Sequence, residues 1–175
     1  SRVPVMTTIA ALKAHPYYDM AKRGSAEHAF FVASEFFRPD VERPLVRDPQ
    51  NTRIAYVHAE EATGRNALPA GLADAIENAG LGRKSDDIVQ AVRAGHTGAT
   101  ALERLATPPQ FHGPVEAGRD YLLVDDVVTS GSSLNALRAH IEAGGGHVLG
   151  AVTYGATMHP QTGYSGDLAP TQETR

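Results

Sequence analysis

Two kinds of hydrophobic pattern alternate along the middle of this chain. Short apolar runs, typical of strands that are buried on both faces, occupy residues 53–58, 88–92, 121–125 and 147–153. Apolar residues at helical spacing occupy 68–76 and 132–143, and glycines follow both patterns. Strands that alternate with helices favour an α/β fold with a parallel sheet and right-handed crossovers. We therefore expect a parallel sheet with helices on both faces.

The N-terminal part of the chain has a different pattern. Residues 8–38 are predicted to be helical, with interruptions at Pro16 and Gly24. Ser25 is placed as the N-cap of a helix over 26–38, which contains four of the five phenylalanines. Such a cluster is wide for one buried face, so core packing and a lid or oligomer surface both stay open. Residues 39–52 are expected to form a connection.

Composition removes several classes of function. The 175 residues include no cysteine, which excludes disulfides, thiolate catalysis and Cys-ligated zinc, and the histidines show no metal-ligand spacing. The net charge of −4 gives no global basic field that would favour nucleic acid or a membrane surface. No apolar run approaches the roughly 20 residues of a membrane span. We expect a cytoplasmic protein that binds neither membranes nor nucleic acid.

The most informative stretch is residues 121–135. An apolar strand ends in two carboxylates, Asp125 and Asp126, and a turn of small residues then leads into a helix. Parallel sheets bind ligands at the carboxyl ends of their strands. Free N–H groups at a helix N-terminus suit a phosphate, and carboxylates suit sugar hydroxyls. A phosphorylated sugar is therefore the first candidate ligand.

Three other phosphate-binding patterns fit less well. A P-loop needs a glycine directly before its lysine, and Gly82-Arg83-Lys84-Ser85 lacks one. A receiver domain would place its acidic residues near the first strand. A dinucleotide site needs spaced glycines after a first strand, whereas Gly144-Gly145-Gly146 follows a helix and is read as its C-terminal cap.

The acidic stretch resembles the phosphoribosyl-pyrophosphate (PRPP) motif of the type I phosphoribosyltransferases. The similarity covers four apolar residues, Asp125 and Asp126, two valines, and the turn Thr129-Ser130-Gly131-Ser132-Ser133. The resemblance implies a single domain over 1–175 with a parallel-sheet core at 53–155. It also implies a small hood, built from the N-terminal helices (1–45), the C-terminal tail (156–175), or both.

The resemblance also implies roles for the motif residues. Asp125 and Asp126 would hydrogen-bond the ribose 2′- and 3′-hydroxyls. The PRPP-binding segment would be Val127, Val128, Thr129, Ser130, Gly131, Ser132 and Ser133, with the turn wrapping the 5′-phosphate. Mg²⁺ would bind through PRPP oxygens and waters, with Asp125 and Asp126 as its candidate protein ligands.

Two further loops are expected from the same resemblance. The pyrophosphate loop would lie after strand 53–58, with a non-proline cis peptide at Ala59-Glu60 and positive charge from Arg65. A mobile catalytic loop would lie within 93–119, where Arg93 and His96 are the candidates for charge and proton transfer. His58, at the end of a predicted strand, is a further candidate.

The expected activity is therefore transfer of ribose 5-phosphate from PRPP to a nitrogen base, or the reverse, with Mg²⁺ as cofactor and a homodimer as the assembly. Thr129 stands where 6-oxopurine members of the family carry an aspartate, which disfavours a 6-oxopurine and leaves the nucleobase-like substrate open. A regulatory or partner-binding module that binds PRPP or a nucleotide without catalysis is the alternative.

Overall fold

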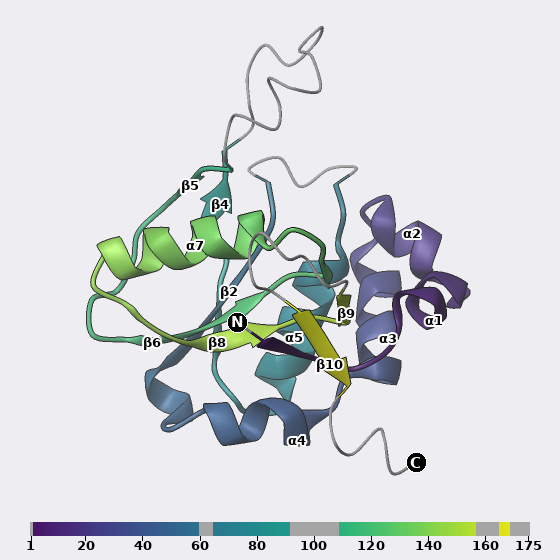
Figure 1. Ribbon diagram of the computed structural model, residues 1–175, viewed down its shortest axis with the longest axis horizontal. Helices are drawn as coiled ribbons and strands as arrows, with labels where there is room; N and C mark the ends of the chain where they lie inside the picture. Colours follow the sequence, from purple (N-terminus) through teal and green to yellow (C-terminus); the bar gives the residue numbers. More distant parts are fainter. Residues whose placement is uncertain (1, 60–64, 92–108, 157–164, 169–175) are drawn as a thin grey trace, which may run out of the picture.

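The centre of the protein is a four-stranded parallel sheet. The computed structural model describes residues 2–59, 65–91, 109–156 and 165–168. The sheet has the order β3-β2-β6-β8, formed by Arg83–Ser85, Thr52–Tyr56, Asp120–Val124 and His147–Val152 (Figure 1). All three strand pairs are parallel. The predicted mixed α/β fold with a parallel sheet is confirmed.

Both faces of this sheet are covered by helices. One face packs against α5 (Leu68–Asn78), and the other packs against α7 (Ser132–Ala143). Successive side chains of a strand point to opposite faces. Ile54 and Leu122 accordingly lie in the core beneath α5, whereas Ala55 and Leu123 lie in the core beneath α7. This double burial explains why the central strands are continuous apolar runs in the sequence.

Three helices form the N-terminal part that was predicted to be helical. They are α1 (Ile9–Ala14), α2 (Tyr18–Lys22) and α3 (Ala26–Phe36), and α3 packs on α5. The predicted N-cap is confirmed, because the Ser25 hydroxyl accepts a hydrogen bond from the His28 N–H. The phenylalanine cluster divides: Phe36 and Phe37 pack at the margin of the core, whereas Phe31 is 49% exposed.

One predicted core strand is wrong. The described part of the predicted strand 88–92, residues 88–91, does not enter the main sheet; β4 (Val89–Gln90) instead pairs antiparallel with β5 (Phe111–His112). Among residues 88–91, only Ile88 is fully buried. The outer neighbour of β2 is β3 instead. It is short and lies at the edge of the sheet, and its residues are polar. Its sequence, Arg-Lys-Ser, has no hydrophobic pattern that would reveal a strand.

The remaining elements are short. The connection after α3 contains α4 (Pro39–Glu42) and two 3-10 turns, η1 (Arg43–Leu45) and η2 (Pro49–Asn51). Two parallel pairs lie outside the main sheet, and neither was expected. They are β1 (Arg2–Val5) with β10 (Ser165–Leu168), and β7 (Val127–Val128) with β9 (Gly155–Ala156). Among the described residues, no helix has the length and apolar character of a membrane span.

The contact between α3 and α5 gives a prediction about stability. A Cβ atom on Gly71 would lie 2.5 Å from the Ala29 carbonyl oxygen, so Gly71→Ala forces the two helices apart. We expect a net loss of about 1–3 kcal/mol of unfolding free energy in urea denaturation, because overpacking outweighs the gain in helix propensity. Asn78→Ala, at an exposed position of the same helix, is the control and should stay within about 0.5 kcal/mol of the wild type. Equal stability of Gly71→Ala and the wild type would contradict the close packing.

Candidate functional site

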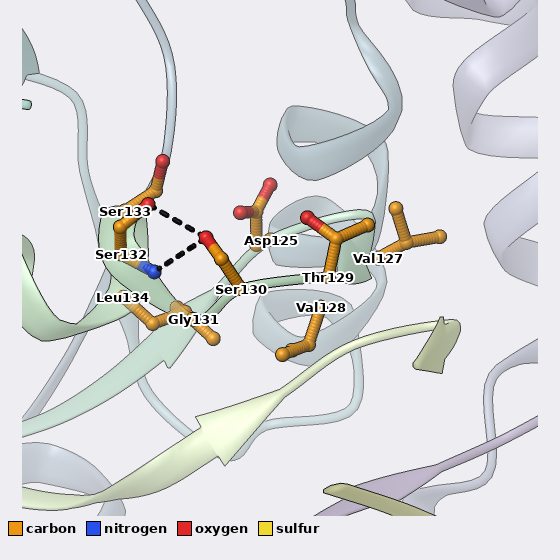
Figure 2. A pocket seen from close by; sticks show the side chains of 9 residues that line it. All are labelled: Asp125, Val127, Val128, Thr129, Ser130, Gly131, Ser132, Ser133 and Leu134. Carbon is orange, nitrogen blue, oxygen red and sulfur yellow. Dashed lines mark hydrogen bonds between the residues drawn. The ribbon is translucent and has the colours of Figure 1, made fainter. Parts of the chain in front are cut away.

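A small cavity lies at the carboxyl edge of the sheet, where β6 ends. Asp125 follows the strand, the turn runs through residues 129–131, and α7 begins at Ser132. Figure 2 shows the cavity, which is lined by Asp125, Val127, Val128, Thr129, Ser130, Gly131, Ser132, Ser133 and Leu134. Its volume of about 70 Å³ exceeds the roughly 10–15 Å³ that one water molecule needs. The strand, turn and helix that the sequence predicts here are confirmed.

The turn is shaped to present polar groups to this cavity. Gly131 has a left-handed backbone, with φ of 79°, and is the N-cap of α7. The Ser130 hydroxyl accepts a hydrogen bond from the Ser132 N–H at 3.2 Å and lies 2.8 Å from the Ser132 hydroxyl (Figure 2). The N–H groups of the first helical turn, including those of Ser133 and Leu134, have no acceptor within the helix. Such a helix terminus attracts anions.

The two adjacent carboxylates have different surroundings. Asp125 lines the cavity and accepts a hydrogen bond from the Asp126 N–H at 2.8 Å. Asp126 is buried and does not line this cavity. Its Oδ1 accepts from the Val127 N–H at 2.8 Å, and its Oδ2 accepts from Lys22 Nζ at 3.0 Å and Asn66 Nδ2 at 2.9 Å. The two carboxylates are therefore not equivalent.

Lys22 and Asn66 were not predicted as site residues. Lys22 belongs to α2 and is 104 positions from Asp126 in the chain, while Asn66 is 60 positions away. Neither lies in a motif. The two residues are revealed only by the fold, which brings α2 and the segment before α5 to the carboxyl end of β6.

These surroundings move the pKa values of the two carboxyl groups in opposite directions. Burial raises the pKa of Asp126, but the Lys22 ammonium, together with hydrogen bonds from Asp125, Lys22 and Asn66, outweighs burial and leaves this pKa below its usual value. Burial and the adjacent negative charge of Asp126 raise the pKa of Asp125 well above its usual value. Negative charge therefore resides first on Asp126, and a proton is retained longest on Asp125.

Other predicted site residues lie elsewhere. Arg65 is exposed, and Ala59 is half-buried in an isolated bridge with Gln90. The His58 ring stacks on Tyr56, with centroids 4.0 Å apart. None of these three predicted residues lines the cavity beside Asp125. Glu60, and with it the predicted cis peptide, lies outside the described residues, as do the loop candidates Arg93 and His96.

The donor set limits how a metal ion could bind. Within the described parts of the chain, no group of three His, Cys, Asp or Glu side chains could hold a metal ion. Asp125 is the only one of the two acids that lines the cavity. A single carboxylate fits Mg²⁺, which commonly takes one or two carboxylates and completes its coordination with waters and substrate oxygens.

Comparison with known proteins gives two curated relatives. The chain is 37% identical to protein TraN of Escherichia coli over 147 residues, which is 82% of this chain and 32% of TraN. It is 33% identical to an uncharacterized protein of Haemophilus influenzae over 129 residues, which is 73% of this chain and 29% of that protein. The chain thus spans about a third of the length of the curated relatives that it matches.

Comparison with family models and solved structures does not assign the chain to a family. No family model matches the chain. A purine phosphoribosyltransferase from Pyrococcus horikoshii aligns over 94% of this chain and 92% of its own, with 12% identity and a TM-score of 0.39. A score of this size does not establish a common fold.

The backbone of the turn gives a prediction about ligand binding. Gly131→Val places a β-branched side chain on a left-handed backbone at the cavity wall. We expect it to lose about 1–2 kcal/mol of unfolding free energy and to abolish the binding of ribose 5-phosphate in calorimetric titration. Gly118→Val is the matched control: Gly118 also has a left-handed φ, of 83°, but lies away from the cavity. The control should lose similar stability and keep the ligand. Equal affinity in Gly131→Val and the wild type would mean that the turn does not hold the phosphate.

Proposed function

We propose that this chain is a phosphoribosyltransferase, which binds PRPP at the cavity beside Asp125 and transfers ribose 5-phosphate to or from a nitrogen base. One observation supports this proposal most strongly. A carboxyl group, several hydroxyls, a left-handed glycine and a helix N-terminus line the same cavity at the carboxyl edge of a parallel sheet. These groups are suited to a ligand that carries both hydroxyls and a phosphate.

The 5′-phosphate would be bound by the turn and the start of α7. Hydroxyls of Thr129, Ser130, Ser132 and Ser133 surround the cavity. Gly131 lets the backbone approach a phosphate closely because it has no side chain. The positive end of the α7 dipole adds about 0.3–1 kcal/mol in favour of an anion at an exposed site. The segment would therefore bind phosphate mostly through dipoles, because the described residues that line the cavity include no lysine or arginine.

The ribose would lie over Asp125. In the reaction, the bond between ribose C1 and a pyrophosphate oxygen breaks, and a bond from C1 to a nitrogen of the base forms. The electron pair of the broken bond leaves with pyrophosphate, and the base nitrogen gives up its proton. Asp125 would orient the sugar through its hydroxyls. Arg93 and His96 remain our candidates for positive charge and proton transfer at the reacting centre.

Mg²⁺ is the cofactor that we propose, and when bound it would neutralise charge on the pyrophosphate. Asp125 would be its protein ligand rather than Asp126, because Asp125 lines the cavity and Asp126 does not. Ala59, Glu60 and Arg65 remain candidates for the pyrophosphate loop. We also keep a homodimer and a cytoplasmic location as expectations.

A second candidate function rests on the unequal acidic pair. Only Asp125 lines the cavity, whereas Asp126 is bound to Lys22 and Asn66. A protein that binds PRPP or a nucleotide as a regulator needs the phosphate-binding turn but not a complete catalytic arrangement. Such a module would bind PRPP without turning it over.

Binding and turnover of PRPP test the two candidates together. We expect Asp125→Asn to weaken PRPP binding about 10- to 150-fold in calorimetry with Mg²⁺, the equivalent of about 1.5–3 kcal/mol for hydrogen bonds of a charged group. Asp87→Asn, at an exposed position away from this cavity, is the matched control and should bind as the wild type does.

Pyrophosphate release across a panel of purine and pyrimidine bases separates the outcomes. Release with at least one base supports the transferase. Tight PRPP binding without release for any base supports the regulatory module instead. Absence of PRPP binding by the wild type would contradict both candidates.

A further inference from the structure

Three separate segments of the chain meet at the carboxylate of Asp126. Lys22 reaches it from α2, Asn66 reaches it from the segment before α5, and Asp126 itself follows β6. We propose that the two adjacent acids have different tasks, with Asp126 as an anchor that joins these three segments and Asp125 as the acid that meets the ligand. This inference rests on the proposed function, because it divides the roles within the PRPP motif. Lys22 and Asn66 are then positioning residues.

The burial of Asp126 supports the anchor role. The Asp126 side chain is 8% exposed, whereas that of Lys22 is 46% exposed. A buried carboxylate is stable only if its charge is paired and its oxygens accept hydrogen bonds. Asp126 meets this requirement with one ammonium, one amide and one backbone N–H. Asp126 is also absent from the lining of the cavity, so a ribose bound there would meet Asp125 first.

The orientation of Asn66 is fixed independently. Its Oδ1 accepts a hydrogen bond from the Leu68 N–H at 3.0 Å, so its Nδ2 is the group left to donate to Asp126. Next to it, the Ala67 N–H donates to the Ala21 carbonyl at 3.0 Å, and Ala21 is fully buried. Side-chain and backbone contacts therefore join α2 to the segment before α5 at the same place.

Asp126 joins two segments that are each expected to bind part of the ligand. Lys22 lies in the N-terminal part expected to form the hood, and Asn66 follows the segment expected to hold pyrophosphate. Loss of Lys22 should therefore change the position of the Asp126 carboxylate as well as the position of α2. A lysine that only stabilised the surface would change neither.

The direct test follows hydrogen exchange of the Ala67 amide, which joins the segment before α5 to the Ala21 carbonyl of α2, without ligand. In Lys22→Met we expect this amide to exchange faster than in the wild type, because the contact that holds α2 at Asp126 is gone. Lys22→Arg keeps the charge and should restore slow exchange. Lys13→Met removes an exposed lysine of α1 and is the matched control that should exchange as the wild type does. Unchanged exchange of the Ala67 amide in Lys22→Met would overturn the inference.

PRPP binding with Mg²⁺, measured by calorimetry, tests the division of roles. We expect Lys22→Met to weaken binding roughly 3- to 30-fold, within the range of coupling in one ion-pair network. Lys22→Met combined with Asp126→Asn should bind no more weakly than Asp126→Asn alone, because both changes remove the same contact. Two results together would overturn the inference. One is a folded Asp126→Asn variant that binds PRPP as weakly as Asp125→Asn does. The other is a double variant, Lys22→Met with Asp126→Asn, whose loss of affinity is the product of the two single losses.

Failure of the anchor role and failure of the proposed function can be told apart. If Asp126→Asn does not fold, which an anchor predicts, the Lys22→Met and Lys22→Arg pair still decides the matter. If the wild type does not bind PRPP, the proposed function fails, whereas the exchange of the Ala67 amide still supports or overturns the anchor.

Discussion

The arrangement of this site depends on one buried carboxylate. Asp126 is taken out of solvent at the end of β6 and is compensated by Lys22 and Asn66, which come from two other segments. Removing one partner of such a group leaves an uncompensated charge, so the three segments are held together by an electrostatic requirement as well as by packing. The same requirement turns Asp126 away from the cavity and leaves Asp125 to line it. Two neighbouring acids thus acquire different environments from the same strand end.

The sheet explains why these groups meet at all. Parallel strands end at one edge, and the burial of both faces under α5 and α7 leaves this edge as the place where polar groups can gather. The turn after β6 enters α7 through a left-handed glycine, which directs the helix N-terminus at the cavity. The fold therefore places a helix N-terminus at the cavity where we propose that the phosphate binds. The acids and hydroxyls then define which phosphate-containing ligand we propose.

Much of the core could be predicted from the sequence, since strands buried on both faces must be apolar throughout. The strands at 53–58, 121–125 and 147–153 were predicted for this reason, and the helices that follow two of them were predicted from apolar residues at helical spacing. The structure confirms these elements within a few residues. The edge strand β3 was missed because its polar sequence carries no such pattern, and 88–92 was misassigned because a single buried Ile88 sits in an apolar run. Within the site, the local order of strand, acids, turn and helix was readable. The partners of Asp126 were not, because contacts over 60 and 104 positions leave no periodic trace.

The most direct test of the account is a crystal structure of the protein with PRPP and Mg²⁺. We expect the 5′-phosphate to lie against residues 129–133 and the ribose hydroxyls to lie within hydrogen-bond distance of Asp125, while Asp126 keeps its contacts with Lys22 and Asn66. PRPP bound at another surface, or ribose hydroxyls bound by Asp126 with Lys22 displaced, would contradict it.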